Sequence, residues 1–83
     1  MKLDEQLAHF DRKAEQAFIK CLKEWKARRE DIIATARKRI IAGYDLYEAE
    51  GYRWGYHKLR DARLEEYADA VNYELMSEYQ GWQ

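Results

Sequence analysis

The sequence predicts a single all-α domain whose helices bury their apolar faces against another copy of the chain or another protein. Three observations support this prediction: apolar residues recur every three or four positions, the 83 residues contain no proline, and the first glycine is Gly43. A chain of this length buries only about 60 to 65% of the surface that its unfolded state exposes. Residues 1–83 are therefore expected to fold as one unit with a small core of its own.

The first expected element is one long helix from about residue 4 to about residue 47, and the alternative is a break near residue 30. Its apolar stripe comprises Leu3, Leu7, Phe10, Ala14, Ala17, Phe18, Cys21 and Trp25, and resumes at Ile32, Ile33, Ala36, Ile40 and Tyr44. In the alternative, Asp31 caps a second helix. Continuity is favoured because Ala34, not Glu, follows Asp31 by three residues, so no capping box marks a restart.

A loop is expected over Glu48–His57, because Gly51 and Gly55 interrupt the helical period there. A final helix is expected from about residue 58 to about residue 79, followed by a frayed end at Gly81 and Trp82. One face of this helix carries Leu64, Tyr67, Ala68, Val71 and Leu75. The result is a helical hairpin or three-helix bundle with an antiparallel C-terminal helix.

Association follows from a mismatch in length, because the final helix cannot cover a first helix about twice as long. Large apolar patches on water-soluble proteins usually mark association surfaces. The expected interface residues are Leu3, Leu7, Phe10, Phe18 and Trp25. Charge agrees with this expectation: residues 1–41 hold eleven Lys and Arg against seven Asp and Glu, whereas residues 42–83 hold four against nine. Halves of opposite charge attract each other within a hairpin or between two antiparallel chains.

The composition points to a cytoplasmic protein without a membrane partner. No run approaches the roughly 20 apolar residues of a membrane span, and no secretory signal is readable at the N-terminus. Cys21 lies on the apolar stripe and is expected to be a buried structural thiol. His9 and His57 lack further ligands at zinc spacing, so zinc is not expected.

Aromatic and basic side chains alternate in the loop, which allows two interpretations. Tyr52, Trp54 and Tyr56 beside Arg53 and Lys58 suit base stacking and phosphate contact, as in a nucleotide or single-stranded nucleic-acid site. Alternatively, the rings close the open end of the hairpin, and this interpretation is favoured.

A loose positive band follows the long helix, and acidic residues of another helix or subunit are favoured over DNA or RNA as its counterparts. The band comprises Lys20, Lys23, Lys26, Arg28, Arg29, Arg37, Lys38 and Arg39.

Two acidic pairs provide the main chemical signal. Glu66 and Asp69 lie three apart on the final helix, and Asp45 and Glu48 lie three apart before the loop. If the two helices are adjacent, four carboxylates converge, and Mg²⁺ or Mn²⁺ would relieve their repulsion. The alternative is a solvated acidic face that pairs with nearby Lys and Arg.

The segment EEYADAVNY at residues 65–73 resembles the E-x-x-D helix of MazG-type all-α nucleoside-triphosphate pyrophosphohydrolases, and Glu66 and Asp69 match its acids. In that family an E-E-x-x-E helix comes first, and both motifs hold Mg²⁺ that activates water for attack on the phosphate chain. Asp45 and Glu48 stand for the second and last acids of the first motif, while Tyr44 occupies its leading position. The resemblance covers the C-terminal half of the chain.

Two functions are compatible with these sequence features. The favoured one is a small helical interaction protein that forms a homo-oligomer and binds another protein. By analogy with many compact helical dimers, it would serve as an accessory or inhibitor protein of a bacteriophage or mobile element. The alternative is a Mg²⁺-dependent MazG-like hydrolase or a nucleotide-binding relative of it.

Overall fold

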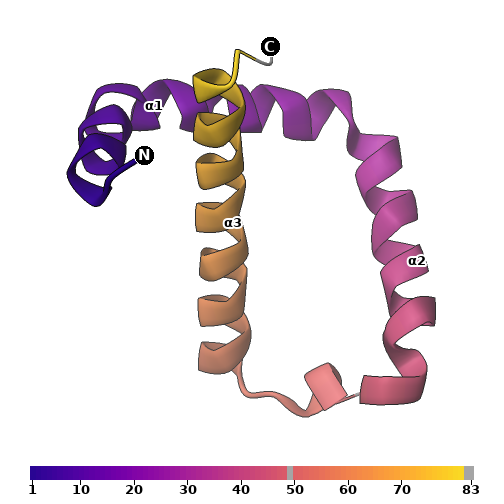
Figure 1. Cartoon of the computed structure of the whole chain (residues 1–83). Coiled ribbons are helices and arrows are strands. Elements are labelled where there is room, and N and C mark those ends of the chain that lie inside the picture. Colours follow the sequence, from indigo (N-terminus) through magenta and orange to yellow (C-terminus); the bar gives the residue numbers. More distant parts are fainter. Residues whose placement is uncertain (49, 82–83) are drawn as a thin grey trace.

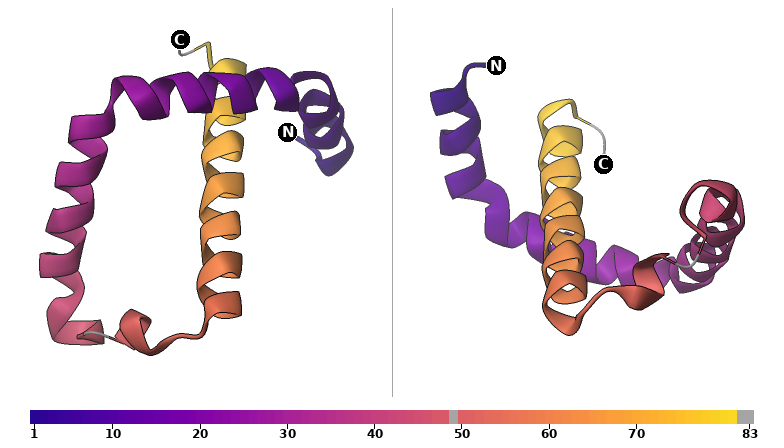
Figure 2. Two further views of the ribbon diagram at one scale, coloured as in Figure 1. Left: turned by 180° about the vertical axis from the view of Figure 1, so that it is seen from behind. Right: turned by 90° about the horizontal axis from the view of Figure 1, so that it is seen from below.

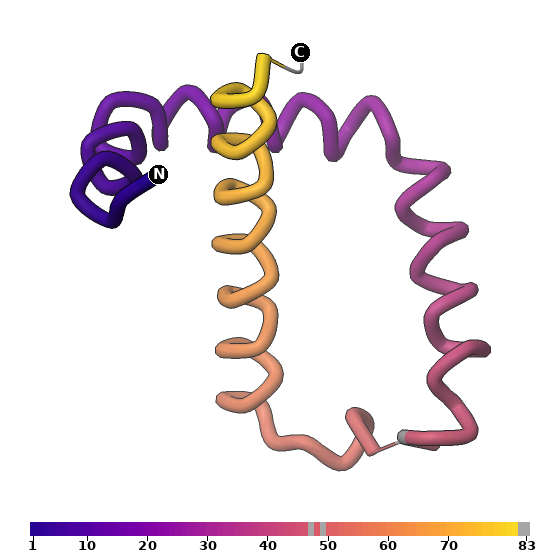
Figure 3. Tube along the Cα trace, in the orientation of Figure 1, coloured from indigo at the N-terminus to yellow at the C-terminus, as the bar shows by residue number. Residues whose placement is uncertain are grey.

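The computed structural model describes residues 1–48 and 50–81 and confirms the all-α class. The elements in chain order are α1 (Leu3–Ala27), α2 (Arg29–Tyr47), the short 3-10 helix η1 (Glu50–Arg53) and α3 (Tyr56–Tyr79). They form an open frame, with α1 across one end, α2 and α3 as antiparallel arms, and η1 closing the opposite end (Figures 1 and 3). No strand occurs in the described ranges, and Trp82 lies outside them.

The long helix is interrupted at Arg28, so the favoured continuous helix is wrong and the alternative break near residue 30 is confirmed. Arg28 has φ −105° and ψ 24°, which departs from the α-helical ψ near about −42° and turns the chain into a corner. The expected cap is also wrong: Arg28 holds the N-cap position of α2 without a side-chain cap hydrogen bond, and Asp31 lies within the first turn.

Backbone and side-chain contacts hold this corner from both sides. The Arg28 N–H donates to the Glu24 carbonyl at 2.8 Å, and the Arg28 carbonyl accepts from the Ile32 N–H at 2.9 Å. The Arg28 guanidinium lies 3.2 Å from the Glu24 carboxylate and 3.7 Å from that of Asp31. The helical hydrogen bonds therefore continue on each side of a single non-helical residue, which a residue pattern with period 3.6 does not reveal.

The loop between the arms has the expected place, although α3 begins two residues earlier than expected, at Tyr56. Glu48 ends α2 with φ 46°, a left-handed conformation that is uncommon outside glycine. Gly55 occupies the N-cap position of α3, and its carbonyl accepts the Leu59 N–H at 3.1 Å. Gly81, with φ 80°, follows α3 and permits the left-handed turn that commonly ends a helix.

Helix packing is concentrated where α1 crosses α3 at a steep angle (Figure 2). Ala17 is fully buried and Leu75 is 6% exposed, and they are the buried apolar residues of the described chain. The small side chain of Ala17 lets the two helices approach closely. The Cys21 thiol lies 3.6 Å from the Ala70 carbonyl, which marks the same crossing. A smaller contact joins α1 to α2, and α2 makes no comparable contact with α3 in the described ranges.

None of the described helices has the length and apolar character needed to cross a membrane.

The buried position of Leu75 leads to a stability prediction. Leu75→Ala removes a side chain that is 6% exposed, and it is expected to lower the free energy of unfolding by about 2 to 3 kcal/mol. Leu46→Ala makes the same chemical change where the side chain is 79% exposed, and should alter it by less than about 0.5 kcal/mol. Urea denaturation at one fixed protein concentration measures both values. Equal losses in the two variants would contradict a core at the crossing.

Candidate functional site

The most prominent surface of the chain is the uncovered apolar stripe of α1. All five residues that the sequence analysis predicted to form an interface are exposed to solvent: Leu3, Leu7, Phe10, Phe18 and Trp25. Apolar side chains normally leave water when a folded protein offers them a partner. Since α3 covers α1 only around Ala14, Ala17 and Cys21, the large side chains of the stripe stay exposed in the described part of the chain.

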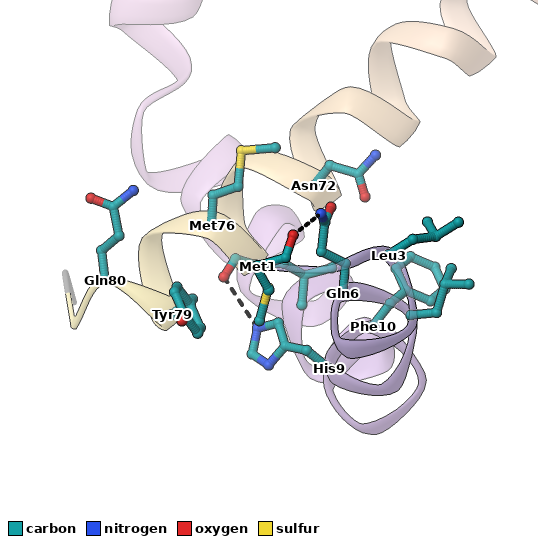
Figure 4. A pocket seen from close by; sticks show the side chains of 11 residues that line it. Met1, Leu3, Gln6, His9, Phe10, Asn72, Met76, Tyr79 and Gln80 are labelled. Atoms are coloured by element: carbon teal, nitrogen blue, oxygen red, sulfur yellow. Dashed lines mark hydrogen bonds between the residues drawn. The ribbon is translucent and has the colours of Figure 1, made fainter.

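A groove of about 380 Å³ lies between the start of α1 and the end of α3 (Figure 4). Its apolar walls include Leu7 and Phe10 from α1 and Met76 and Tyr79 from α3. Two internal hydrogen bonds involve polar groups of the groove: the Gln6 amide donates to the Met1 carbonyl at 2.9 Å, and the His9 imidazole lies 3.3 Å from the Leu75 carbonyl. The uncharged amides of Asn72 and Gln80 also line it, and among the described residues no Asp, Glu, Lys or Arg does. The groove is therefore suited to apolar side chains rather than to a charged ligand.

Two further hollows flank the crossing of α1 and α3. One has a volume of about 380 Å³ and is bordered by Ala14, Phe18, Ile19 and Val71. The other has a volume of about 320 Å³ and includes Trp25 and Tyr73 in its lining. Hollows on both sides of the contact extend the apolar surface from α1 onto α3, and a partner helix could fill them with side chains.

An ion pair fixes the position of α3 against α1. The Lys20 ammonium group donates to the Glu78 carboxylate at 2.9 Å and lies 3.8 Å from Glu74. The hydrogen bond to Glu78 raises the pKa of Lys20. Because the lysine is exposed, this pair contributes more to the register of the two helices than to stability. Glu78 is therefore one acidic counterpart of the positive band.

The four carboxylates of the metal prediction lie on both arms of the frame. Asp45 belongs to α2, Glu48 follows it, and Glu66 and Asp69 belong to α3. Within residues 1–48 and 50–81, no group of three or more His, Cys, Asp or Glu side chains is close enough to hold a metal ion. The single chain therefore does not bring these pairs together, and a site shared between two chains stays a prediction.

The aromatic loop lies at the end of the frame farthest from α1 (Figure 1). Tyr52 is 88% exposed, and Tyr56 is also exposed, with the Arg60 guanidinium 6.0 Å from its ring centroid. Trp54 is half-buried, and the Lys58 ammonium lies 4.0 Å from its ring centroid. This cation occupies a ring face that a stacked base would need.

Three contacts at the crossing were not expected from the sequence. His9 was solitary in the pattern, yet it reaches Leu75 and packs edge-on against Tyr79, with ring centroids 6.1 Å apart. Ala17 was assigned to the stripe, but the pattern did not show that it would be the fully buried residue of the crossing. A small residue inside a stripe of large ones was the only available signal.

No protein-family model matches the sequence, and neither the curated proteins nor the solved structures gave a match. The similarity to the MazG-type motif therefore stays a prediction that depends on Glu66 and Asp69.

Cys21 is half-buried rather than buried as expected, and its environment predicts slow thiol chemistry. Burial raises the pKa of this thiol, with the Glu74 and Glu24 carboxylates adding to the effect, so less reactive thiolate is present near neutral pH. Alkylation by iodoacetamide at pH 8 is expected to be slower in the native chain than in the same chain unfolded in concentrated urea. Equal rates in the two states would contradict the role of Cys21 as a structural thiol.

Proposed function

We propose that this chain is a small helical interaction protein that acts as a homo-oligomer. The surface left exposed in the oligomer would bind a protein partner. The observation that carries the proposal is the surface area of the chain. A compact monomer of 10.1 kDa exposes about 5,300 Å², whereas this chain exposes 7850 Å². The excess of about 2,500 Å² exceeds the roughly 800 Å² that each partner buries in an interface of standard size.

The dimensions of the frame support the same conclusion. The radius of gyration is 15.7 Å, whereas a compact domain of this length has a value of about 12 Å. Among the described residues only Ala17 and Leu75 count as a buried apolar core. So small a core gives little free energy to offset the conformational entropy that folding removes. Burial between chains would supply the missing stabilisation, as in obligate dimers whose interface resembles a divided core.

The character of the exposed surface favours a protein partner over a nucleic acid. It is apolar along α1 and is bordered by charges of both signs, with Lys20 already paired to Glu78. Nucleic-acid binding depends on a basic excess, but the chain has a formal net charge of −1, and its C-terminal half offers acids to the basic side chains of α2. A role as an accessory or inhibitor protein, which works by covering a surface of its target, is consistent with this arrangement.

Sedimentation equilibrium tests the oligomer directly. The chain is expected to sediment at a multiple of 10.1 kDa. Phe18→Asp places a charge on the apolar stripe and should shift the equilibrium toward the monomer, because the charge must be desolvated in the interface. Gln16→Asp introduces the same charge on the opposite side of α1 and should leave the mass unchanged. A monomer of the unmodified chain at every concentration would overturn the proposal.

The alternative, a MazG-like hydrolase, makes a separate prediction. An interaction protein is expected to release no pyrophosphate above background from any nucleoside triphosphate in the presence of Mg²⁺. Release that depends on Mg²⁺ and disappears in Glu66→Gln, with the oligomer retained, would favour the enzyme instead. In that case Asp45 and Glu48 of a second chain are the expected further ligands.

A further inference from the structure

We propose that α2 of one copy packs antiparallel against α3 of a second copy, and that the same contact forms twice around a two-fold axis. This inference rests on the proposed homo-oligomer and names the surface that forms it. Its starting point is that α2 has no helix packed along its length within the described part of its own chain. The occupant must complement α2 in apolar pattern and in charge, and α3 of another copy meets both conditions.

The corner at Arg28 prevents the two arms of one chain from making this contact. α1 is anchored on α3 near Cys21, whose thiol lies 3.6 Å from the Ala70 carbonyl. From Cys21 to Arg29, where α2 begins, α1 advances by about 12 Å at ~1.5 Å per residue. Packed helices lie about 8 to 10 Å apart, so α1 holds its own α2 beyond packing distance from α3. A second copy has no such spacer between its α3 and this α2.

The apolar residues of the two helices have matching spacing in opposite directions. Along α2 the stripe runs Ile33, Ala36 and Ile40, and along α3 in reverse it runs Val71, Ala68 and Leu64. Both series advance by three and then four residues. An antiparallel register therefore places Ile33 opposite Val71, Ala36 opposite Ala68, and Ile40 opposite Leu64. Ile33, Ile40 and Leu64 are all more than half exposed in the single chain.

The hollow beside Val71 agrees with this register. Its other walls are Ala14, Glu15, Phe18 and Ile19, and its volume is about 380 Å³. Ile33 of the second copy is opposite Val71 in the register, so this hollow would receive its side chain. Filling it would also cover part of the exposed ring of Phe18, which joins the α2 contact to the apolar stripe of α1.

Charge complementarity supports the same register independently. The middle of α2 carries Arg37, Lys38 and Arg39, and the facing level of α3 carries the acids Glu65, Glu66 and Asp69. All six side chains belong to exposed residues, and none makes an ion pair in the part of the chain that the structure describes. In the antiparallel register Arg37, one position after Ala36, and Glu65, one position after Leu64, border the same side of the contact and differ in level by about 3 Å. Lys38 and Glu66 lie two positions from the stripe residues and add to the opposite charges of the two helices without facing the contact. Opposite charges arranged in this way fix register and partner choice.

A charge-exchange experiment tests the contact. One variant carries Arg37→Glu, and the other carries Glu65→Lys. Each variant alone places like charges opposite each other twice in the dimer, and its dissociation constant is expected to rise about tenfold or more at low salt. Mixing the two variants pairs opposite charges at both contacts and should restore a heterodimer of the original affinity. The matched control, Lys23→Glu on α1, should dimerise as the unmodified chain does.

Sedimentation of each variant and of the mixture, after circular dichroism has shown helical folding, separates the outcomes. Restoration in the mixture supports the contact between copies. Restoration only when both changes are combined in one chain would place the contact within the chain and overturn the inference. Unchanged affinity in both variants would also overturn this contact, although the chain would still form a homo-oligomer. A monomeric unmodified chain would instead overturn the proposed function.

Discussion

The rest of the structure depends on the crossing of α1 and α3 at Ala17 and Leu75. It is the one place where the described helices of this chain bury apolar side chains from water, and the Lys20–Glu78 ion pair fixes its register. Because the helices cross steeply, they bury only the short stretch where they meet. Everything else follows from that geometry: the two ends of α1 extend beyond α3, and the corner at Arg28 carries α2 away from it.

This geometry explains why a well-patterned sequence leaves its apolar faces in water. Helix α1 is amphipathic, and its apolar stripe could pack against another helix along its whole length. Helix α3 contacts only the middle of α1. Stability then depends on what covers Phe10 and Phe18 on α1 and Leu64 on α3. The proposed contact between α2 and α3 of two copies covers the arms of the frame, and the hollow beside Val71 connects it to α1. Folding and association would therefore be coupled.

The sequence predicted the helices and the loop well because their signals are local. Apolar spacing marks the helices, and Gly51 and Gly55 mark the loop. It did not predict the corner, because Arg28 is neither glycine nor proline and the helical hydrogen bonds resume at once on both sides. The position of the crossing was equally hidden: the contact of His9 with Leu75 joins residues 66 positions apart, and no local pattern encodes such a pairing.

The sequence could predict the apolar stripe of α1 but not the separation of the four carboxylates, for a physical reason. An apolar stripe needs only one helix to exist, so its residues could be named from spacing alone. A site built from Asp45, Glu48, Glu66 and Asp69 needs two helices at a particular distance, and the spacer formed by α1 sets that distance. The central claim is that burial between chains stabilises this fold, and thermal unfolding followed by circular dichroism tests it most directly. The midpoint temperature should rise as protein concentration rises. A midpoint that is independent of concentration would contradict the account.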